Sequence, residues 1–525
     1  MLGDALFERA VRERPGDPGF LYFDTPIEAG EAAARARRLA GALRGELGLR
    51  PGDRVALMLQ NVPQFPIAVH AVWRCGGIVT AVNPMNKERE LRHQLADSGA
   101  RVVVCLESLH PVVEAAREGL GEVEHVVTVS ELDMLGSAPR ALAGHARLEC
   151  PGAIPFESLL GAAEGEAAEV SPDDPALITY TSGTTGTPKG AIGTHAAVAH
   201  TASAMVDWGG LAPGDVTVAM APLFHITGLI CHMATARAST TPLLLLYRFE
   251  AGEILRLIER WRGTYVIGPL TAFIAMLDHP SFDERDLSSL TKVASGGAPV
   301  YPAIVERWSR ATGTYLHNTY GLTETAAPSH LTPLGTHAPV DPESGALSVG
   351  LPIAGTSSRV VSVDDRSDAA TGEEGEILTR GPAVSPGYWN RPEESSAAIE
   401  DGWLRTGDIG KRDADGWYYL VDRIKDMINV SGYKVWPREV EDALFRHPDV
   451  AEGCVVGAPD DYRGESVVAY VVARAGAAVD EADIIAHCRT QLAVYKAPRR
   501  VVFVDEIPKT ATGKALRREL RRRAS

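Results

Sequence analysis

One stretch of the chain combines glycines, hydroxyls and a lysine in a pattern that could bind phosphate. It covers residues 180–190 and reads YTSGTTGTPKG. Glycines let backbone N–H groups approach an anion, the Ser and Thr hydroxyls can donate hydrogen bonds, and Lys189 adds a positive charge. The apolar run at residues 176–180 predicts a buried strand, and the residues from Thr194 onward predict a helix with Thr194 as its N-cap. A strand, a glycine-rich loop and a helix in this order are typical of a phosphate site.

This stretch is not a Walker A loop. That pattern places Gly-Lys-Ser/Thr after a glycine and four further residues. Counted from Gly183, Pro188 stands where the second glycine should be, and Gly190 follows Lys189. The sequence therefore excludes a P-loop NTPase. A surface loop without a ligand is the alternative, and the preceding strand and the Pro-Lys-Gly ending argue against it.

Size and composition describe a soluble globular protein of more than one domain. The chain has 525 residues, of which 45% are hydrophobic and 23% charged, and its formal net charge is -16. That length predicts at least two domains, and the acidic balance argues against a nucleic-acid partner. The six cysteines show no CxxC spacing, so we expect a reducing, cytoplasmic setting. We find no secretory signal core at the N-terminus and no apolar run of transmembrane length.

The pattern of apolar residues predicts an α/β fold. Residues 1–50 have a helical periodicity, and after them strands at 54–59 and 101–106 alternate with helices at 65–75 and 91–98. Such alternation is typical of βα units in a mostly parallel sheet. From residue 345 the texture changes to short strands separated by turns, which indicates a β-rich part. After residue 422 about 100 residues remain, enough for a small α+β domain.

Four further motifs follow the loop in order along the chain. They read NTYGLTET at 318–325, WLRTGDI at 403–409, DRIKDMINVSGYKVWPREVE at 422–441 and PKTATGKAL at 508–516. In this order the chain resembles, over nearly its whole length, the adenylate-forming (ANL) superfamily of acyl-CoA synthetases, carrier-protein adenylation domains and luciferases. The last part is most similar to fatty-acyl-CoA ligases. The resemblance implies a large N-terminal domain at 1–421 with its β-rich part at 345–421, a hinge at 422–426, and a small mobile domain at 427–525.

The resemblance also implies a reaction in two steps. A carboxylic acid and ATP first form an acyl-adenylate and pyrophosphate with Mg²⁺ as cofactor, and coenzyme A then displaces AMP to give a thioester. The expected acid is a medium- or long-chain fatty acid, with an aryl or cinnamate-like acid second. A carrier-protein thiol as acceptor and a homodimer stay open. Residues 224–227 read FHIT and lack the carboxylate that would hold an amino-acid substrate, and they lack the His-His-Gly-Phe of luciferases.

The resemblance assigns the polar motif residues to ATP or AMP. Tyr320 would stack on adenine with Asn318 and Thr319 along its edge, and Asp408 would accept from both ribose hydroxyls. The β- and γ-phosphates would lie against the glycine-rich loop, and Thr323 would donate to the α-phosphate. The full nucleotide set is Thr181, Ser182, Gly183, Thr184, Thr185, Gly186, Lys189, Ala298, Asn318, Thr319, Tyr320, Gly321, Thr323, Asp408, Arg423 and Lys514.

The remaining roles implied by the resemblance concern metal, catalysis and motion. Glu324 would bind Mg²⁺, and Lys514 would bridge the incoming carboxylate and the α-phosphate. With Lys514 present alongside Glu324 and Asp408, a non-catalytic homologue is disfavoured. Lys425 would be the hinge of the small domain. The expected catalytic residues are Lys514, His225, Thr184 and Lys189; the acyl pocket is His225, Thr227, Gly228, Gly296, Gly297 and Ala298; and the coenzyme A channel is Ser431 and Gly432.

Overall fold

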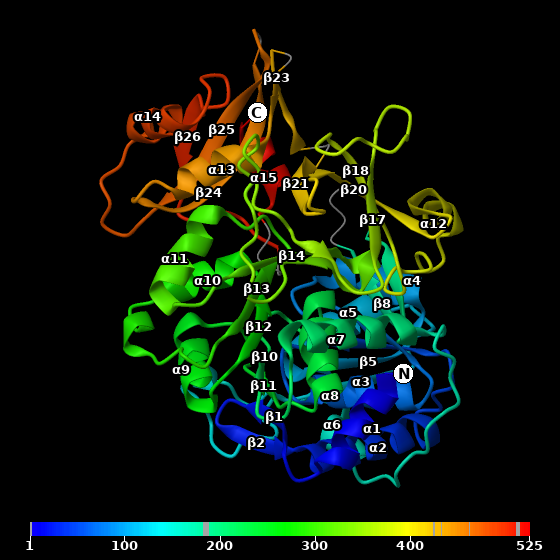
Figure 1. Cartoon of the computed structure of the whole chain (residues 1–525). Helices are drawn as coiled ribbons and strands as arrows, with labels where there is room; N and C mark the ends of the chain where they lie inside the picture. The colour runs from blue at the N-terminus through cyan, green and yellow to red at the C-terminus, as the bar shows by residue number, and fades with distance from the viewer. Residues whose placement is uncertain are drawn as a thin grey trace.

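The computed structural model in Figure 1 describes residues 3–181, 188–423, 426–431, 433–460, 462–510 and 515–524. Within these residues the chain forms a large N-terminal domain built on two extended sheets and a β-rich sheet, and a smaller C-terminal domain with its own sheet. The predicted α/β class with a β-rich part and a small α+β domain is confirmed.

The first extended sheet has seven strands among the described residues, in the order β7-β6-β5-β3-β4-β8-β9. Neighbouring strands are parallel except β8 and β9, and α3 (Gln64–Arg74), α4 (Glu88–Ser98) and α5 (His110–Arg117) connect them as the predicted βα units. The strands are β3 (Arg54–Met58), β4 (Ile78–Ala81), β5 (Ala100–Leu106), β6 (His125–Val129), β7 (Ile154–Pro155), β8 (Pro175–Tyr180) and β9 (Gly190–Thr194).

The strand β9 changes the predicted context of the glycine-rich loop. The loop joins the antiparallel strands β8 and β9, which pair Ile178 with Ile192, so it is not followed directly by a helix as the sequence suggested. The residues directly after the loop form hydrogen bonds with β8, so they continue as the strand β9, and the helix starts only after this strand. Helix α7 (His195–Gly209) then begins as predicted, and Thr194 is confirmed as its N-cap, with Oγ1 accepting from Ala197 N at 3.1 Å.

The second extended sheet has nine strands among the described residues, in the order β16-β15-β14-β13-β12-β10-β11-β1-β2. The six strands from β14 to β1 along this order are parallel, and both edges are antiparallel. The strands are β1 (Pro18–Tyr22), β2 (Thr25–Glu28), β10 (Thr217–Val218), β11 (Leu243–Leu245), β12 (Tyr265–Gly268), β13 (Lys292–Gly296), β14 (His317–Leu322), β15 (Ala327–Leu331) and β16 (Leu351–Pro352).

The hairpin β1–β2 corrects the prediction that residues 1–50 are helical. It lies between α1 (Gly3–Glu13) and α2 (Ala29–Gly45), and β1 pairs with β11 more than 200 residues away. Phe20, Leu21 and Tyr22 are buried in this strand. Pairing with a distant strand thus decides the structure here, over the helical periodicity on either side.

One large hydrophobic core contains residues of both extended sheets, and a second, smaller one lies against the seven-stranded sheet with α4 and α5. Helices α1, α7 and α8 pack on one another, and Trp73 of α3 meets the ring of His195 in α7 edge-on, with centroids 5.7 Å apart. The other elements of this part are α6 (Phe156–Leu159), the π-helix Gly228–Ala234, α8 (Thr235–Ser239), α9 (Ala251–Trp261), α10 (Leu270–Leu277), α11 (Pro302–Thr312) and the 3₁₀ turns Glu107–Leu109, Arg140–Leu142, Phe282–Glu284 and η5 (Thr323–Thr325).

The β-rich sheet is antiparallel throughout and follows β16 in the chain. Its elements are β17 (Ser357–Val361), β18 (Gly375–Arg380), α12 (Pro392–Ala398), β19 (Ile399–Glu400), β20 (Trp403–Arg412) and β21 (Tyr418–Arg423).

The C-terminal domain, orange to red in Figure 1, lies beside α11 and β21. Its sheet is antiparallel except for β26, which runs parallel to β25. The elements are β22 (Ile428–Val430), β23 (Tyr433–Val435), α13 (Pro437–Phe445), β24 (Val450–Asp460), β25 (Gly464–Ala473), α14 (Glu481–Gln491), β26 (Arg500–Phe503) and α15 (Arg517–Ala524). Among the described residues of the whole chain, none of the helices is both long and apolar enough to span a bilayer.

Candidate active site

The two described ends of the glycine-rich loop are held together at its base. Thr181 N donates to Lys189 O at 2.9 Å, and Lys189 N donates to Thr181 Oγ1 at 3.4 Å. The Lys189 ammonium lies 5.0 Å from the ring centroid of Tyr388. The loop residues predicted to bind phosphate, Ser182, Gly183, Thr184, Thr185 and Gly186, lie outside the described residues.

Tyr320 and Asp408 meet although they come from different sheets. Tyr320 lies on β14 and Asp408 on β20, and the phenol donates to Asp408 Oδ2 at 2.8 Å. Both side chains are buried, and the Tyr320 ring contacts His330, whose pKa burial lowers to about 3, so that this imidazole is neutral. A carboxylate offers about four lone-pair positions and can accept from several donors, which is what binding a diol requires. The structure therefore brings an aromatic ring and a carboxylate together as the nucleoside assignment requires.

Asn318 and Thr319 flank this pair but point their polar groups into the protein. Asn318 Nδ2 donates to Ser348 O at 2.9 Å, and Thr319 Oγ1 donates to His330 O at 3.0 Å. Both residues are buried. In the structure these two side chains fix β14 against its neighbours, while Tyr320 carries the aromatic face.

Glu324 forms the other polar centre of the site. It lies in η5, directly after β14 and Thr323, and its Oε1 accepts from the Tyr388 hydroxyl at 2.7 Å. Burial and the nearby Glu324 charge raise the pKa of Tyr388, so the phenol stays protonated and donates. Within the described residues there is no cluster of three or more possible metal ligands. Mg²⁺ fits such a place, because it commonly takes one or two protein carboxylates together with phosphate oxygens and water.

Tyr388 is the site residue that the sequence did not reveal. It lies in the loop between β18 and α12, far along the chain from both of its partners, and its local sequence, Gly-Tyr-Trp-Asn, carries no recognisable chemical signal. Its backbone forms a β-bridge with Ala191 of β9. Only the folded chain places this phenol between Lys189 and Glu324.

The residues assigned to the acyl pocket lie at or after the carboxyl ends of strands in the nine-stranded sheet, the end of the sheet where Glu324 follows β14. His225 comes after β10, and Gly296 ends β13, in strands that run parallel to β14. The carboxyl ends of parallel strands share one edge, which is the usual ligand edge of such sheets. His225 is partly buried, and its Nδ1 accepts from Thr227 N at 3.3 Å, directly before the π-helix. π-Helical turns occur often at functional sites.

Gly228 and Gly296 are small because the protein itself approaches them closely. A Cβ on Gly228 would lie 2.1 Å from Pro222 O, and one on Gly296 would lie 2.5 Å from Thr319 O. The space beside these two glycines is thus filled by backbone. Of the other assigned residues, Gly297 is exposed and Ala298 is partly buried.

The C-terminal residues are only partly described. Lys425, Gly432 and Lys514 lie outside the described residues, and of Arg423 only the backbone is described, opposite Asp408 in the β20–β21 ladder. Ser431 is exposed in the turn between β22 and β23. Figure 1 shows β23 of this hairpin at the end of the small domain away from the two extended sheets.

Buried polar contacts fix the small domain in this orientation. Arg438 of α13 donates to Val300 O at 3.0 Å and to Leu420 O at 2.9 Å, both in the large domain. Glu441, also on α13 and 1% exposed, accepts from the Tyr301 hydroxyl at 2.5 Å.

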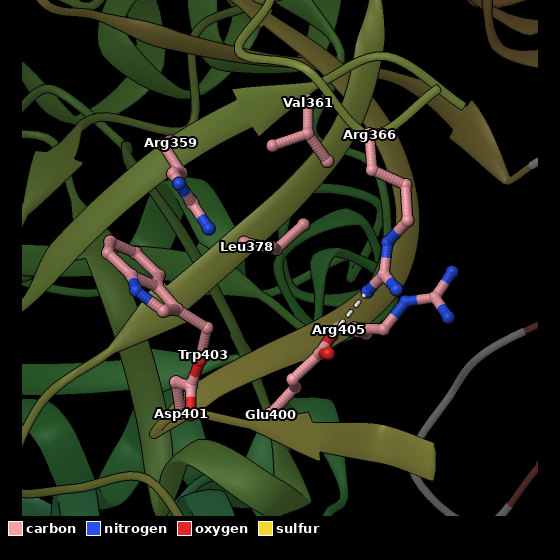
Figure 2. A pocket seen from close by; sticks show the side chains of 8 residues that line it. All are labelled: Arg359, Val361, Arg366, Leu378, Glu400, Asp401, Trp403 and Arg405. Carbon is pink, nitrogen blue, oxygen red and sulfur yellow. Dashed lines mark hydrogen bonds and ion pairs between the residues drawn. The ribbon is translucent and has the colours of Figure 1, made fainter. Parts of the chain in front are cut away.

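A shallow pocket of about 300 Å³ lies elsewhere, on the β-rich sheet (Figure 2). Three arginines line it, and each is matched by a carboxylate: Arg366 pairs with Glu400, Arg405 with Glu376 and Arg359 with Asp368. Its positive charge is therefore compensated within the protein, and it holds none of the residues of the candidate site. The pocket residues are Arg359, Val361, Arg366, Leu378, Glu400, Asp401, Trp403 and Arg405.

Comparison with known families agrees with this geometry. The family model for AMP-binding enzymes matches residues 7–389, and the model for the AMP-binding enzyme C-terminal domain matches residues 439–514. The chain therefore belongs to the AMP-binding enzyme family. Within this adenylate-forming superfamily it is an acyl-CoA synthetase, an ATP-dependent enzyme that uses coenzyme A as co-substrate.

Individual relatives support the same class over the full length. The chain is 37% identical to the long-chain-fatty-acid–CoA ligase of Escherichia coli O157:H7, covering 98% of this chain and 93% of the relative. It is 35% identical to 4-coumarate–CoA ligase 2 of Oryza sativa subsp. japonica, covering 94% and 86%. Among solved structures, the anthranilate CoA ligase AuaEII in complex with anthranoyl-AMP superposes with a TM-score of 0.90 at 29% identity, covering 100% and 97%.

Proposed function

We propose that this chain is an ATP-dependent ligase that joins medium- or long-chain fatty acids to coenzyme A. The observation that supports the proposal is the buried hydrogen bond between Tyr320 and Asp408, which joins an aromatic ring, the kind of group that stacks on a base, to a carboxylate, the kind of group that accepts from a diol. The fatty acid is proposed because the E. coli relative, similar over its whole length, is named a long-chain-fatty-acid–CoA ligase.

In the first step a carboxylate oxygen attacks the α-phosphorus of ATP, and the bond to the pyrophosphate oxygen breaks. Tyr320 stacks on adenine and Asp408 accepts from the ribose hydroxyls. Lys189, with Thr184 and Thr185, holds the β- and γ-phosphates, and Lys514 bridges the two anions that must meet. Glu324 would hold Mg²⁺, which when bound offsets phosphate charge.

In the second step the thiol of coenzyme A attacks the acyl carbonyl carbon, and AMP leaves. We propose that the small domain turns about residues 422–426, with Lys425 as the hinge, to bring Ser431 and Gly432 to the site as the pantetheine channel. The exposure of Ser431 supports this, and so does the position of β23, which lies at the end of the small domain away from the two extended sheets in Figure 1. His225 would then stand where the carboxylate and the thiol meet.

The setting and the partners belong to the same proposal. We place the reaction in the cytoplasm, and the six cysteines, all free in the structure, suit a reducing compartment. A carrier-protein thiol is the alternative acceptor, and a homodimer is the alternative to a single chain.

The test is a panel of medium-chain, long-chain and aromatic acids, assayed for AMP formation with and without coenzyme A. We expect the highest kcat/KM with fatty acids, a requirement for coenzyme A in turnover, and loss of pyrophosphate release in Lys514→Ala. Acyl-AMP that accumulates without turnover by coenzyme A would point to a carrier protein. Undiminished pyrophosphate release in Lys514→Ala would overturn the assignment of Lys514.

An aromatic acid is the second candidate. The rice relative is a 4-coumarate–CoA ligase, and the AuaEII structure holds anthranoyl-AMP. A higher kcat/KM for a cinnamate-like acid than for any fatty acid would replace the first proposal with this one and leave the two-step reaction unchanged.

A further inference from the structure

We propose that Tyr388 is a positioning residue for Mg·ATP, which holds Lys189 and Glu324 apart and in place on the pyrophosphate side of the site. This inference rests on the proposed function, in which Lys189 binds phosphate and Glu324 binds the metal. Tyr388 acts through these two residues.

The first support is the contact geometry of the three side chains. The Tyr388 hydroxyl donates to Glu324 Oε1 at 2.7 Å, and the Lys189 ammonium lies 5.0 Å from the centroid of the same ring. One side chain thus gives the carboxylate a hydrogen-bond donor and gives the ammonium an aromatic face. Lys189 lies directly before β9 and Glu324 directly after β14 in η5, and Tyr388 contacts both.

The second support is the rigid attachment of the segment that carries Tyr388. Ile192 N donates to Gly387 O at 3.0 Å, and Trp389 N donates to Gly190 O at 2.8 Å, so the segment adds to the edge of β9. Tyr388 N donates to Ser395 Oγ at 2.9 Å. On the other side Ser385 N donates to Glu324 O at 2.7 Å. The same segment therefore bonds to the backbone of Glu324 and to that of Gly190, the residue directly after Lys189.

The third support is electrostatic. An ammonium and a carboxylate at the mouth of one site would gain energy by pairing with each other, and each would then be less available to a ligand. A phenol between them supplies a partner to each without carrying charge itself. It keeps the carboxylate oriented for a cation and the ammonium oriented for phosphate oxygens before the nucleotide arrives, which lowers the cost of ordering them on binding.

The test compares Tyr388→Phe and Tyr388→Leu with the wild type in direct binding of Mg²⁺ with a non-hydrolysable ATP analogue. Hydrogen bonds to charged groups contribute enough that losing the hydroxyl should weaken binding about tenfold. The Leu variant, which also removes the aromatic face, should weaken it further, because Lys189 then loses its contact. AMP binding without metal should stay within about twofold of the wild type, because AMP lacks the phosphates that Lys189 and the metal bind.

Tyr419→Phe is the matched control. The Tyr419 hydroxyl also donates to a carboxylate, Asp413 Oδ2 at 2.7 Å, but within the β-rich sheet. This variant should bind both nucleotides as the wild type does. A merely structural loss at Tyr388 would weaken AMP and the Mg·ATP analogue equally, and that result would overturn the inference.

The outcomes separate this inference from the proposed function. If the wild type binds the Mg·ATP analogue and releases pyrophosphate, but Tyr388→Phe binds the analogue with unchanged affinity, the inference on Tyr388 alone is wrong. If the wild type neither binds the analogue nor releases pyrophosphate with any acid, the proposed function fails first. As a second readout, a steady-state Mg²⁺ titration of Tyr388→Phe should show a higher half-saturating concentration, with KM for the acid unchanged.

Discussion

Removing the hydroxyl of Tyr301 should loosen the small domain from the large one. Tyr301 precedes α11 in the large domain and donates to Glu441 of α13 in the small domain at 2.5 Å. Burial and the Glu441 charge raise the pKa of Tyr301, so the phenol is the donor. Tyr301→Phe keeps the ring contact with Phe445, whose centroid is 4.6 Å away. It removes only the hydrogen bond from Tyr301 to Glu441 and leaves the other contacts between the domains in place.

The size of the effect follows from what remains around Glu441. Its carboxylate still accepts from Arg517 at 2.5 and 2.6 Å and from Val455 N at 2.9 Å, all within the small domain. The charge therefore stays paired, and the loss lies at the lower end for hydrogen bonds to charged groups, about 1.5 kcal/mol. That value corresponds to about a tenfold change in the ratio of undocked to docked small domain.

Single-molecule energy transfer measures this ratio directly. Dyes on cysteines introduced at the exposed positions Ser288 and Ala475 report the distance between the two domains. We expect the undocked fraction to rise about tenfold in Tyr301→Phe, and the acyl-adenylate step to slow relative to the thioester step. Tyr470→Phe is the control, because its hydroxyl donates to Leu520 O inside the small domain. An unchanged ratio in Tyr301→Phe, or an equal change in Tyr470→Phe, would refute the reasoning.

Three further variants test other parts of the structure. Asp408→Asn keeps an acceptor for Tyr320 but loses the charge, so AMP should bind about 10- to 100-fold more weakly in calorimetry; unchanged affinity would remove Asp408 from the ribose site. Burial lowers the pKa of His232 to about 4, so the unfolded chain binds more protons below pH 6.5. The free energy of unfolding should therefore fall by about 1.4 kcal/mol per pH unit between pH 6.5 and 4 through this group; a slope in urea unfolding that is no shallower in His232→Gln would contradict this. Gly228→Ala would press a methyl group against Pro222 O, so it should destabilise the fold by about 3 kcal/mol without changing the preferred acyl chain length; a shift to shorter acids at unchanged Tm would instead make Gly228 part of the pocket wall.

Contiguous motifs explain why much of the site could be predicted. Tyr320 and Asp408 each belong to a short contiguous motif that can be recognised in the sequence. The structure joins the two side chains by a hydrogen bond. Tyr388 belongs to no motif of this kind. Its proposed role depends on its contacts with Glu324, which lies 64 residues earlier in the chain, and with Lys189, which lies earlier still. A contact between three segments so far apart in the chain leaves no periodicity or spacing in the sequence.

Elements that depend on distant pairing were also hidden from local patterns. The hairpin β1–β2 forms because β1 pairs with β11, and β9 forms because it pairs with β8 across the glycine-rich loop. Glycines pose a related difficulty. At Gly228 the sequence cannot distinguish a residue kept small for a ligand from one kept small for the protein backbone, and the structure shows the backbone of Pro222 where a Cβ would lie.

The chemistry of the domain contact bears on whether the small domain can leave. Arg438 donates to the backbone oxygens of Val300 and Leu420, and Glu441 accepts from Tyr301, so charged groups on α13 take part in the contact beside the Tyr301–Phe445 ring pair. Water can replace each of these partners after separation, which lowers the cost of release, whereas exposing a large apolar face would cost free energy in proportion to its area. Polar contacts of this kind resemble those of transient interfaces. The contact therefore suits a domain that docks in a defined orientation and then leaves it, which is the property that the proposed second step requires.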